Sequence, residues 1–204
     1  MKIAVMKGIF PLLLFLGLAM PPVLALDDQV LVTGKPRPGG VRMIVLHATG
    51  GPDCIDSRSF RGGTLDGILG HFLRNRSRIS IHYVIGRDGR VVSMVPESQV
   101  AWHVRGHNQD SIGIELVNDG DGVDPFPPAQ IDRLVELLRG LLERHRLDGD
   151  AIKSHAELDD STIVCKGVAI KRKQDPGAAF PWERVLAELR RDSGQDSGQD
   201  SAWN

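Results

Sequence analysis

The chain has 204 residues, which leaves one domain of about 150 residues and a single sizeable core once both ends are set aside. Its 25 basic and 26 acidic residues give a net charge of -1, so nothing indicates nucleic acid as a partner, which would favour a basic surface. The hydrophobic content of 41% is ordinary for a globular protein, and the seven histidines and two cysteines are therefore considered one by one.

Residues 1–25 have the pattern of a secretory signal peptide. Lys2 and Lys7 give a positive start, an apolar run follows, and small residues precede a cleavage point near Ala25. The alternative is an uncleaved membrane anchor. Prolines interrupt the run, however, and the uninterrupted part is shorter than the roughly 20 residues that span a bilayer. We therefore expect an exported protein, periplasmic or secreted, with no stable membrane span in its mature form.

Strands and helices are expected to alternate irregularly after an extended lead-in at residues 26–40. The expected strands are residues 41–46, 79–85, 90–95, 111–117 and 151–152. The expected helices begin after Thr64, at Pro127–Pro128 and at Pro181. Arg87-Asp88-Gly89 predicts a hairpin turn between two of the strands.

This order of elements indicates the α/β class, as a single domain with a mixed central β-sheet flanked by helices. We place the domain at residues 41–190. Residues 191–204 repeat the polar motif SGQD and lack apolar periodicity, so a disordered polar tail is expected there.

A hydrolytic zinc site needs three protein ligands, an open position for water and a base that takes a proton from that water. The sequence offers His47 at a strand end, His155 just after a predicted strand, and Asp175 in a turn fixed by Pro176 and Gly177. Composition alone does not select these three. A lone histidine is more often a structural residue, and Asp-Pro-Gly is more often only a turn.

Six short segments, taken together and in order, carry a family resemblance. They are His47-Ala48-Thr49, residues 80–85 with 87–89, Ala101-Trp102-His103, residues 110–116, Ser154-His155, and residues 173–177 with 180–182. On these segments the chain resembles zinc amidases of the N-acetylmuramoyl-L-alanine amidase type 2 family, relatives of T7-type lysozyme and peptidoglycan recognition proteins. The resemblance covers about residues 41–190. It implies the family's fold and hydrolysis of the amide bond between N-acetylmuramic acid and L-alanine. It also implies one zinc ion per chain and peptidoglycan or a muropeptide as the substrate.

Carried over residue by residue, the resemblance implies that His47, His155 and Asp175 are the zinc ligands. Glu115 matches the catalytic acid–base residue, and Lys173 matches a lysine that stabilises the developing oxyanion. The alternatives are an exposed glutamate on a strand and a surface lysine in a basic run.

Three further residues match positions near the family's substrate cleft: His82, Trp102 and His103. For His82, a structural histidine with hydrogen bonds is an equal alternative. Strand alternation also places Glu115 on the same face as Gly113, where the missing side chain leaves space consistent with a cleft.

The stretch between His155 and Asp175 is longer than in the compact, cell-wall-recycling members of the family. The extra segment, residues 159–170, reads as a loop beside the metal, and its function is not indicated by the resemblance. It leaves Glu157 and Asp159 as rival metal ligands.

Cys54 and Cys165 are the only cysteines, and both fall in predicted loops that follow a candidate ligand. A disulfide between them is reasonable in an oxidising compartment. Two unrelated thiols, or Cys165 as a zinc ligand, are the alternatives.

Two other functions compete with the amidase. A binding module would recognise peptidoglycan without cutting it, but it has no reason to keep three ligands and Glu115 together. A different zinc peptidase would cut within the stem peptide. Intact wall and released anhydro-ended fragments both remain open as substrates.

Overall fold

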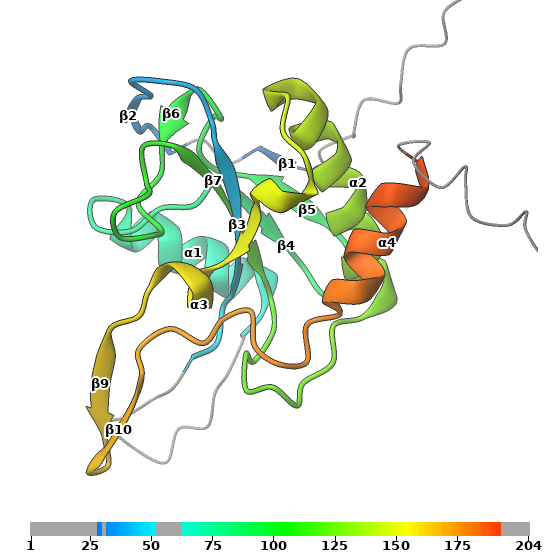
Figure 1. Cartoon of the computed structure of the whole chain (residues 1–204). Coiled ribbons are helices and arrows are strands. Elements are labelled where there is room, and N and C mark those ends of the chain that lie inside the picture. The colour runs from blue at the N-terminus through cyan, green and yellow to red at the C-terminus, as the bar shows by residue number, and fades with distance from the viewer. Residues whose placement is uncertain (1–27, 30–31, 52–62, 193–204) are drawn as a thin grey trace, which may run out of the picture.

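The computed structural model describes residues 28–29, 32–51 and 63–192. The chain is built around a six-stranded sheet with the strand order β1-β5-β4-β7-β3-β8 (Figure 1). Strands β4 and β5 are antiparallel, and the other neighbouring pairs are parallel, so the sheet is mixed. Its strands are β1 (Asp28–Gln29), β3 (Met43–Ala48), β4 (Tyr83–Ile85), β5 (Val91–Ser93), β7 (Ser111–Leu116) and β8 (Ile152–Ser154).

Two antiparallel pairs of short strands lie outside this sheet. They are β2 (Lys35–Pro36) with β6 (Gln99–Val100), and β9 (Thr162–Cys165) with β10 (Val168–Lys171). The β9–β10 hairpin extends away from the body of the domain (Figure 1).

Helices cover both faces of the six-stranded sheet (Figure 1). They are α1 (Leu65–Asn75), α2 (Pro128–His145), the one-turn α3 (His155–Leu158) and α4 (Trp182–Asp192), with a 3-10 turn at Gly149–Ala151. One buried apolar cluster includes Leu69 and Phe72 of α1, and the other joins the opposite face of the sheet to α2 and α4. None of the helices in the described ranges is both long and apolar enough to cross a bilayer.

The pleat of the two central strands decides which side chains reach which layer. Ile44 and Leu46 of β3, like Ile112 and Ile114 of β7, belong to the cluster under α2 and α4. Because successive side chains point to opposite faces, the intervening residues of both strands face α1. The α1 face is therefore where the polar residues at the ends of β3 and β7 gather.

The predicted class, a single α/β domain with a mixed sheet flanked by helices, is confirmed. The predicted helix starts are also close, since Thr64 caps α1 by accepting a hydrogen bond from the Gly67 amide (3.2 Å) and Pro128 begins α2. Helix α4 continues to Asp192, beyond the domain end expected at residue 190.

Several expected elements differ in extent. The strand predicted at 79–85 is reduced to β4, because Ser80 instead exchanges hydrogen bonds with Trp102. Its amide donates to the Trp102 carbonyl (3.0 Å), and its hydroxyl accepts from the Trp102 amide (2.8 Å). The lead-in contributes β1 and β2.

The segment at 159–170 was wrongly expected to be a loop. It forms most of the β9–β10 hairpin, in which Cys165 pairs with Val168 across the turn, so Cys165 lies at a strand end. The predicted signal peptide and Cys54 lie outside the described residues, as does most of the predicted tail.

Candidate metal centre

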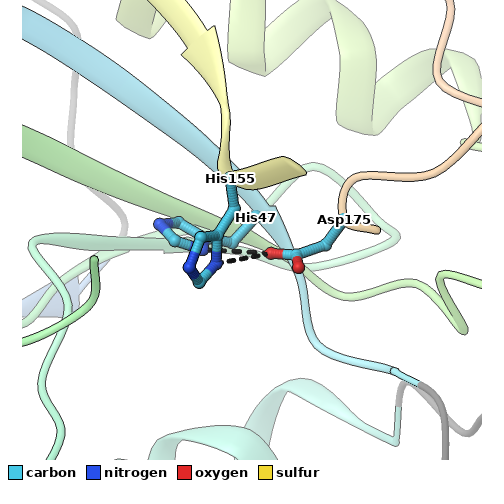
Figure 2. A group of neighbouring side chains, drawn as sticks. All are labelled: His47, His155 and Asp175. Atoms are coloured by element: carbon cyan, nitrogen blue, oxygen red, sulfur yellow. Dashed lines mark hydrogen bonds and ion pairs between the residues drawn. The ribbon is translucent and has the colours of Figure 1, made fainter. Parts of the chain in front are cut away.

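His47, His155 and Asp175 come from three separate segments that meet at one edge of the sheet (Figure 2). His47 is near the carboxyl end of β3, and His155 directly follows β8 as the first residue of α3. Because β3 and β8 are parallel neighbours, their carboxyl ends lie side by side. The turn that carries Asp175 is attached to α3, since the Ala156 amide donates to the Asp175 carbonyl (3.0 Å).

The three side chains converge on one point (Figure 2). Oδ2 of Asp175 lies 3.1 Å from Nδ1 of His47 and 3.1 Å from Nδ1 of His155. The residues are only 3%, 3% and 7% exposed for His47, His155 and Asp175 respectively. They are the group of metal-ligand side chains that the described part of the chain brings together.

This donor set fits zinc. Zinc bonds of about 2.0–2.1 Å in a tetrahedral site separate the ligand atoms by about 3.3 Å, close to the two distances found here. Within the described residues, Nε2 of His155 is buried without a hydrogen-bond partner. The polar contact of this ring is the one between its Nδ1 and Asp175. Three protein ligands with a fourth position open are typical of catalytic zinc sites.

The protonation states also suit a cation. Burial lowers the pKa of His47 to about 4, although Asp175 opposes the shift, so the ring is neutral at pH 7 and can act as a ligand. Burial alone would raise the pKa of Asp175, but the close contacts of its carboxylate with His155 and His47 outweigh burial and hold that pKa well below its usual value. The carboxylate is therefore ionised.

A pocket of about 240 Å³ opens beside these residues. One wall is apolar, formed by Ile68 and Phe72 of α1 together with Ile79. Trp102 lines the pocket and is 42% exposed, so part of this residue is accessible to a ligand. The remaining lining residues are His47, Ala48, Thr49, Gly50, Gly51, His71, His103, Glu115, His155, Lys173 and Asp175.

Glu115 and Lys173, the two predicted catalytic residues, both line this pocket. Glu115 is the register partner of His47 across the β3–β7 pair, so it lies next to the candidate metal centre. Burial raises the pKa of Glu115 to about 8, with a further upward contribution from Asp175 and a downward one from Lys173. A carboxyl group with a pKa near neutrality is suited to take up and return a proton.

The structure supports the structural alternative for His82. The ring is fully buried and does not line the pocket. Its Nδ1 accepts a hydrogen bond from the Gly113 amide (3.0 Å), and its Nε2–H donates to the Gln99 carbonyl (3.1 Å). Burial lowers the pKa of His82 to about 4, so the ring is a neutral bridge between β7 and β6.

The rival ligands have other partners. Glu157 accepts hydrogen bonds from the amide (2.7 Å) and hydroxyl (2.8 Å) of Ser154 in a capping box that begins α3. Asp159 forms an ion pair with Arg172. Cys165 is in the β9–β10 hairpin and does not belong to the converging group.

His103 contacts the metal centre through His47. Nδ1 of His103 lies 3.0 Å from Nε2 of His47, and Nε2 of His103 lies 3.1 Å from Oγ of Ser111. Burial and the neighbouring rings of His47 and His82 lower the pKa of His103 well below its usual value, so this ring is neutral. Ser111 lies in the matched segment 110–116, but nothing in the sequence indicated a role for it.

The space at Gly113 is not part of a cleft, which corrects the sequence interpretation. A Cβ atom at Gly113 would lie 2.6 Å from Nδ1 of His103 and 2.5 Å from Cδ1 of Ile81. Glycine is therefore required so that His103 can pack against β7.

Comparison with known proteins places this arrangement among amidases. The family described as N-acetylmuramoyl-L-alanine amidase matches residues 35–178. The N-acetylmuramoyl-L-alanine amidase AmiD of Escherichia coli is 33% identical over 133 residues, covering 54% of this chain and 45% of AmiD. The 1,6-anhydro-N-acetylmuramyl-L-alanine amidase AmpD of Enterobacter cloacae is 35% identical over 126 residues, covering 58% of this chain and 61% of AmpD. The chain thus spans about half the length of these relatives.

A solved structure shares the fold. It is the complex of AmiD from E. coli with the substrate anhydro-N-acetylmuramic acid-L-Ala-D-gamma-Glu-L-Lys. The two superpose with a TM-score of 0.57 at 26% sequence identity, over 76% of this chain and 58% of the other.

Proposed function

The chain belongs to the N-acetylmuramoyl-L-alanine amidase family, and from this we propose that it hydrolyses the amide bond between N-acetylmuramic acid and L-alanine in peptidoglycan. The observation that carries the proposal is the convergence of His47, His155 and Asp175 beside a pocket that also contains Glu115 and Lys173. We propose that the three converging residues hold one zinc ion per chain.

The chain's own residues have distinct tasks in this reaction. His47, His155 and Asp175 would hold the zinc ion, and Nδ1 of each histidine ring already faces the Asp175 carboxylate. Zinc bound there supplies a Lewis acid that polarises the scissile carbonyl and makes water more acidic. The ionised form of Glu115 accepts a proton from the attacking water, and Glu115 then returns a proton to the leaving nitrogen of L-alanine.

Two further residues of the pocket act on charge and position. The Lys173 ammonium group stabilises the negative charge that develops on the carbonyl oxygen of the lactyl group. The half-exposed Trp102, together with the apolar residues that line the same pocket, orients the substrate. Since AmiD was solved with a muropeptide, a muropeptide is the substrate with which we would begin.

The site of action follows from the substrate and the N-terminal sequence. We propose that residues 1–25 direct export to the periplasm or beyond, where peptidoglycan lies, and are then removed near Ala25. In that oxidising compartment we propose a disulfide between Cys54 and Cys165.

A variant at Glu115 tests the assignment of the base. Glu115→Gln keeps the size of the side chain and the three ligands, so zinc content is expected to stay near one per chain. Turnover of a muropeptide is expected to fall by about 10²–10⁴-fold, the usual contribution of a positioned acid–base group. Glu183→Gln, an exposed residue at the start of α4, is the matched control with unchanged turnover. Near-normal turnover of zinc-loaded Glu115→Gln would show that the base lies elsewhere.

A further inference from the structure

A chain of hydrogen bonds leads from the candidate metal centre back to the main chain of the loop before β7. It runs from Nε2 of His47 to His103, then to Ser111, and ends at the carbonyl of His107. We propose that His103, supported by Ser111, is a positioning residue that holds His47 in the one tautomer able to bind metal. This inference rests on the proposed metal centre and assigns no metal bond to His103 itself.

The donor and acceptor of each hydrogen bond in this series follow from its last member, the His107 carbonyl. A carbonyl oxygen can only accept, so the 2.6 Å contact between Oγ of Ser111 and the His107 carbonyl uses the single hydroxyl proton of Ser111. Towards His103 the same oxygen must then accept, and Nε2 of His103 carries a proton and donates it (3.1 Å). In a neutral His103 ring, Nδ1 is therefore an acceptor.

The last step reaches the metal centre. Since Nδ1 of His103 accepts, the bond of 3.0 Å to His47 requires the proton of His47 to sit on Nε2. Nδ1 of His47, the atom that faces Asp175, is then left with a lone pair directed into the converging group. The backbone carbonyl of His107 thus determines, through two side chains, which nitrogen of His47 is available to a cation.

The packing around His103 makes this arrangement rigid. Ser111 is fully buried, and a side chain at Gly113 would collide with His103, so the ring fits closely over β7. The rings of His47 and His103 meet edge to face at 85°, with centroids 5.1 Å apart, which aims the Nε2–H of His47 at its acceptor. His155 has no such support in the described structure, because its Nε2 is buried without a partner. His47 is therefore the preorganised ligand of the pair.

Two variants of similar shape separate positioning from simple space filling. His103→Asn can keep an acceptor oxygen close to the place of Nδ1, whereas His103→Leu fills the same space without one. His145→Leu removes a histidine that bonds to Glu97 (2.7 Å) away from the pocket, and so serves as the control for losing a histidine hydrogen bond. Zinc affinity is measured on metal-free protein by competition with a chelating dye, which needs no turnover.

The Leu variant is expected to bind zinc about 10–100-fold more weakly than the natural protein, the usual effect of losing an outer partner of a ligand histidine. The Asn variant and His145→Leu are expected to stay close to the natural affinity. Ser111→Ala, a smaller change, should weaken zinc binding in the same direction. It keeps the test decisive if His103→Leu does not fold.

Other outcomes would overturn the inference. Equal zinc affinity of the Asn and Leu variants, or an unchanged affinity of Ser111→Ala, would show that the chain of bonds does not position His47. So would nitrogen NMR of the zinc-loaded natural protein that places the proton of His103 on Nδ1. If the natural protein binds no zinc, the proposed function fails instead, which distinguishes the two results.

Discussion

Replacing Glu115 by Gln is expected to stabilise the metal-free protein at alkaline pH while removing its activity when zinc is present. Folding raises the pKa of this carboxyl group from 4.5 to about 8, because the folded chain takes it out of water and sets it beside Asp175. Between these two pH values the folded state keeps a proton that the unfolded state has released. The contribution of Glu115 to stability therefore falls as pH rises from 4.5 to about 8.

The size of the effect follows from the two pKa values. Above pH 8 their separation corresponds to about 5 kcal/mol, at about 1.4 kcal/mol for each pH unit. That figure is a ceiling, because Glu115 is only half-buried and opens into the pocket. A Gln amide also costs about 1–3 kcal/mol where it lacks a partner. The net gain expected for Glu115→Gln is roughly 2–4 kcal/mol at pH 9, or roughly 4–16 °C in Tm for a chain of this size.

The assay is thermal unfolding of both proteins after chelation of metal, at pH 5 and at pH 9. The stabilisation by Gln should be large at pH 9 and nearly absent at pH 5, where the glutamic acid is protonated in the folded state. A Gln variant that is less stable than the natural protein at both pH values would contradict this prediction. It would mean that the folded protein does not disfavour the ionised form of Glu115.

The remaining predictions concern the metal, the oxyanion and the cysteines. His155→Ala and Asp175→Asn should each lose zinc as measured by elemental analysis, and either variant retaining a full complement would exclude that residue as a ligand. Lys173→Met should keep zinc but lower kcat by about 10²–10³-fold, as for loss of one oxyanion donor. An unchanged kcat would show that Lys173 does not stabilise the oxyanion. Peptide mapping of exported protein without reductant should find Cys54 joined to Cys165, and two free thiols would rule the pair out.

The sequence predicted best those features that depend on short segments. The ends of β3 and β8 could be located from apolar runs followed by a histidine, and the fold then brings His47 and His155 to the same edge. The turn at Asp175 was also readable from Pro176 and Gly177. Glu115 could be placed on the correct face by strand alternation alone, since Ile112 and Ile114 belong to the cluster under α2 and the residues that alternate with them face the other way.

Other features depend on register and on contacts between distant segments. That Glu115 stands opposite His47 requires the pairing of β3 with β7, which no local pattern encodes. The hydrogen bonds from His47 through His103 to Ser111 cannot be predicted from the sequence for the same reason, and the sequence alone indicates a cleft at the glycine that in fact makes room for His103. The β9–β10 hairpin was missed although its strands, TIVC and VAIK, are rich in apolar and β-branched residues and flank a Lys-Gly turn, so a local signal for a hairpin was present.

Amidase activity is tested most directly by identifying the bond that the protein cuts. Purified protein with one equivalent of zinc is incubated with anhydro-N-acetylmuramic acid-L-Ala-D-gamma-Glu-L-Lys, the compound bound by AmiD, and the products are separated by mass. The expected products are the intact anhydro sugar and a free tripeptide with L-alanine at its amino end, and neither should form after chelation. Cleavage between the amino acids of the peptide, or no cleavage by protein that holds its zinc, would contradict the proposed amidase activity.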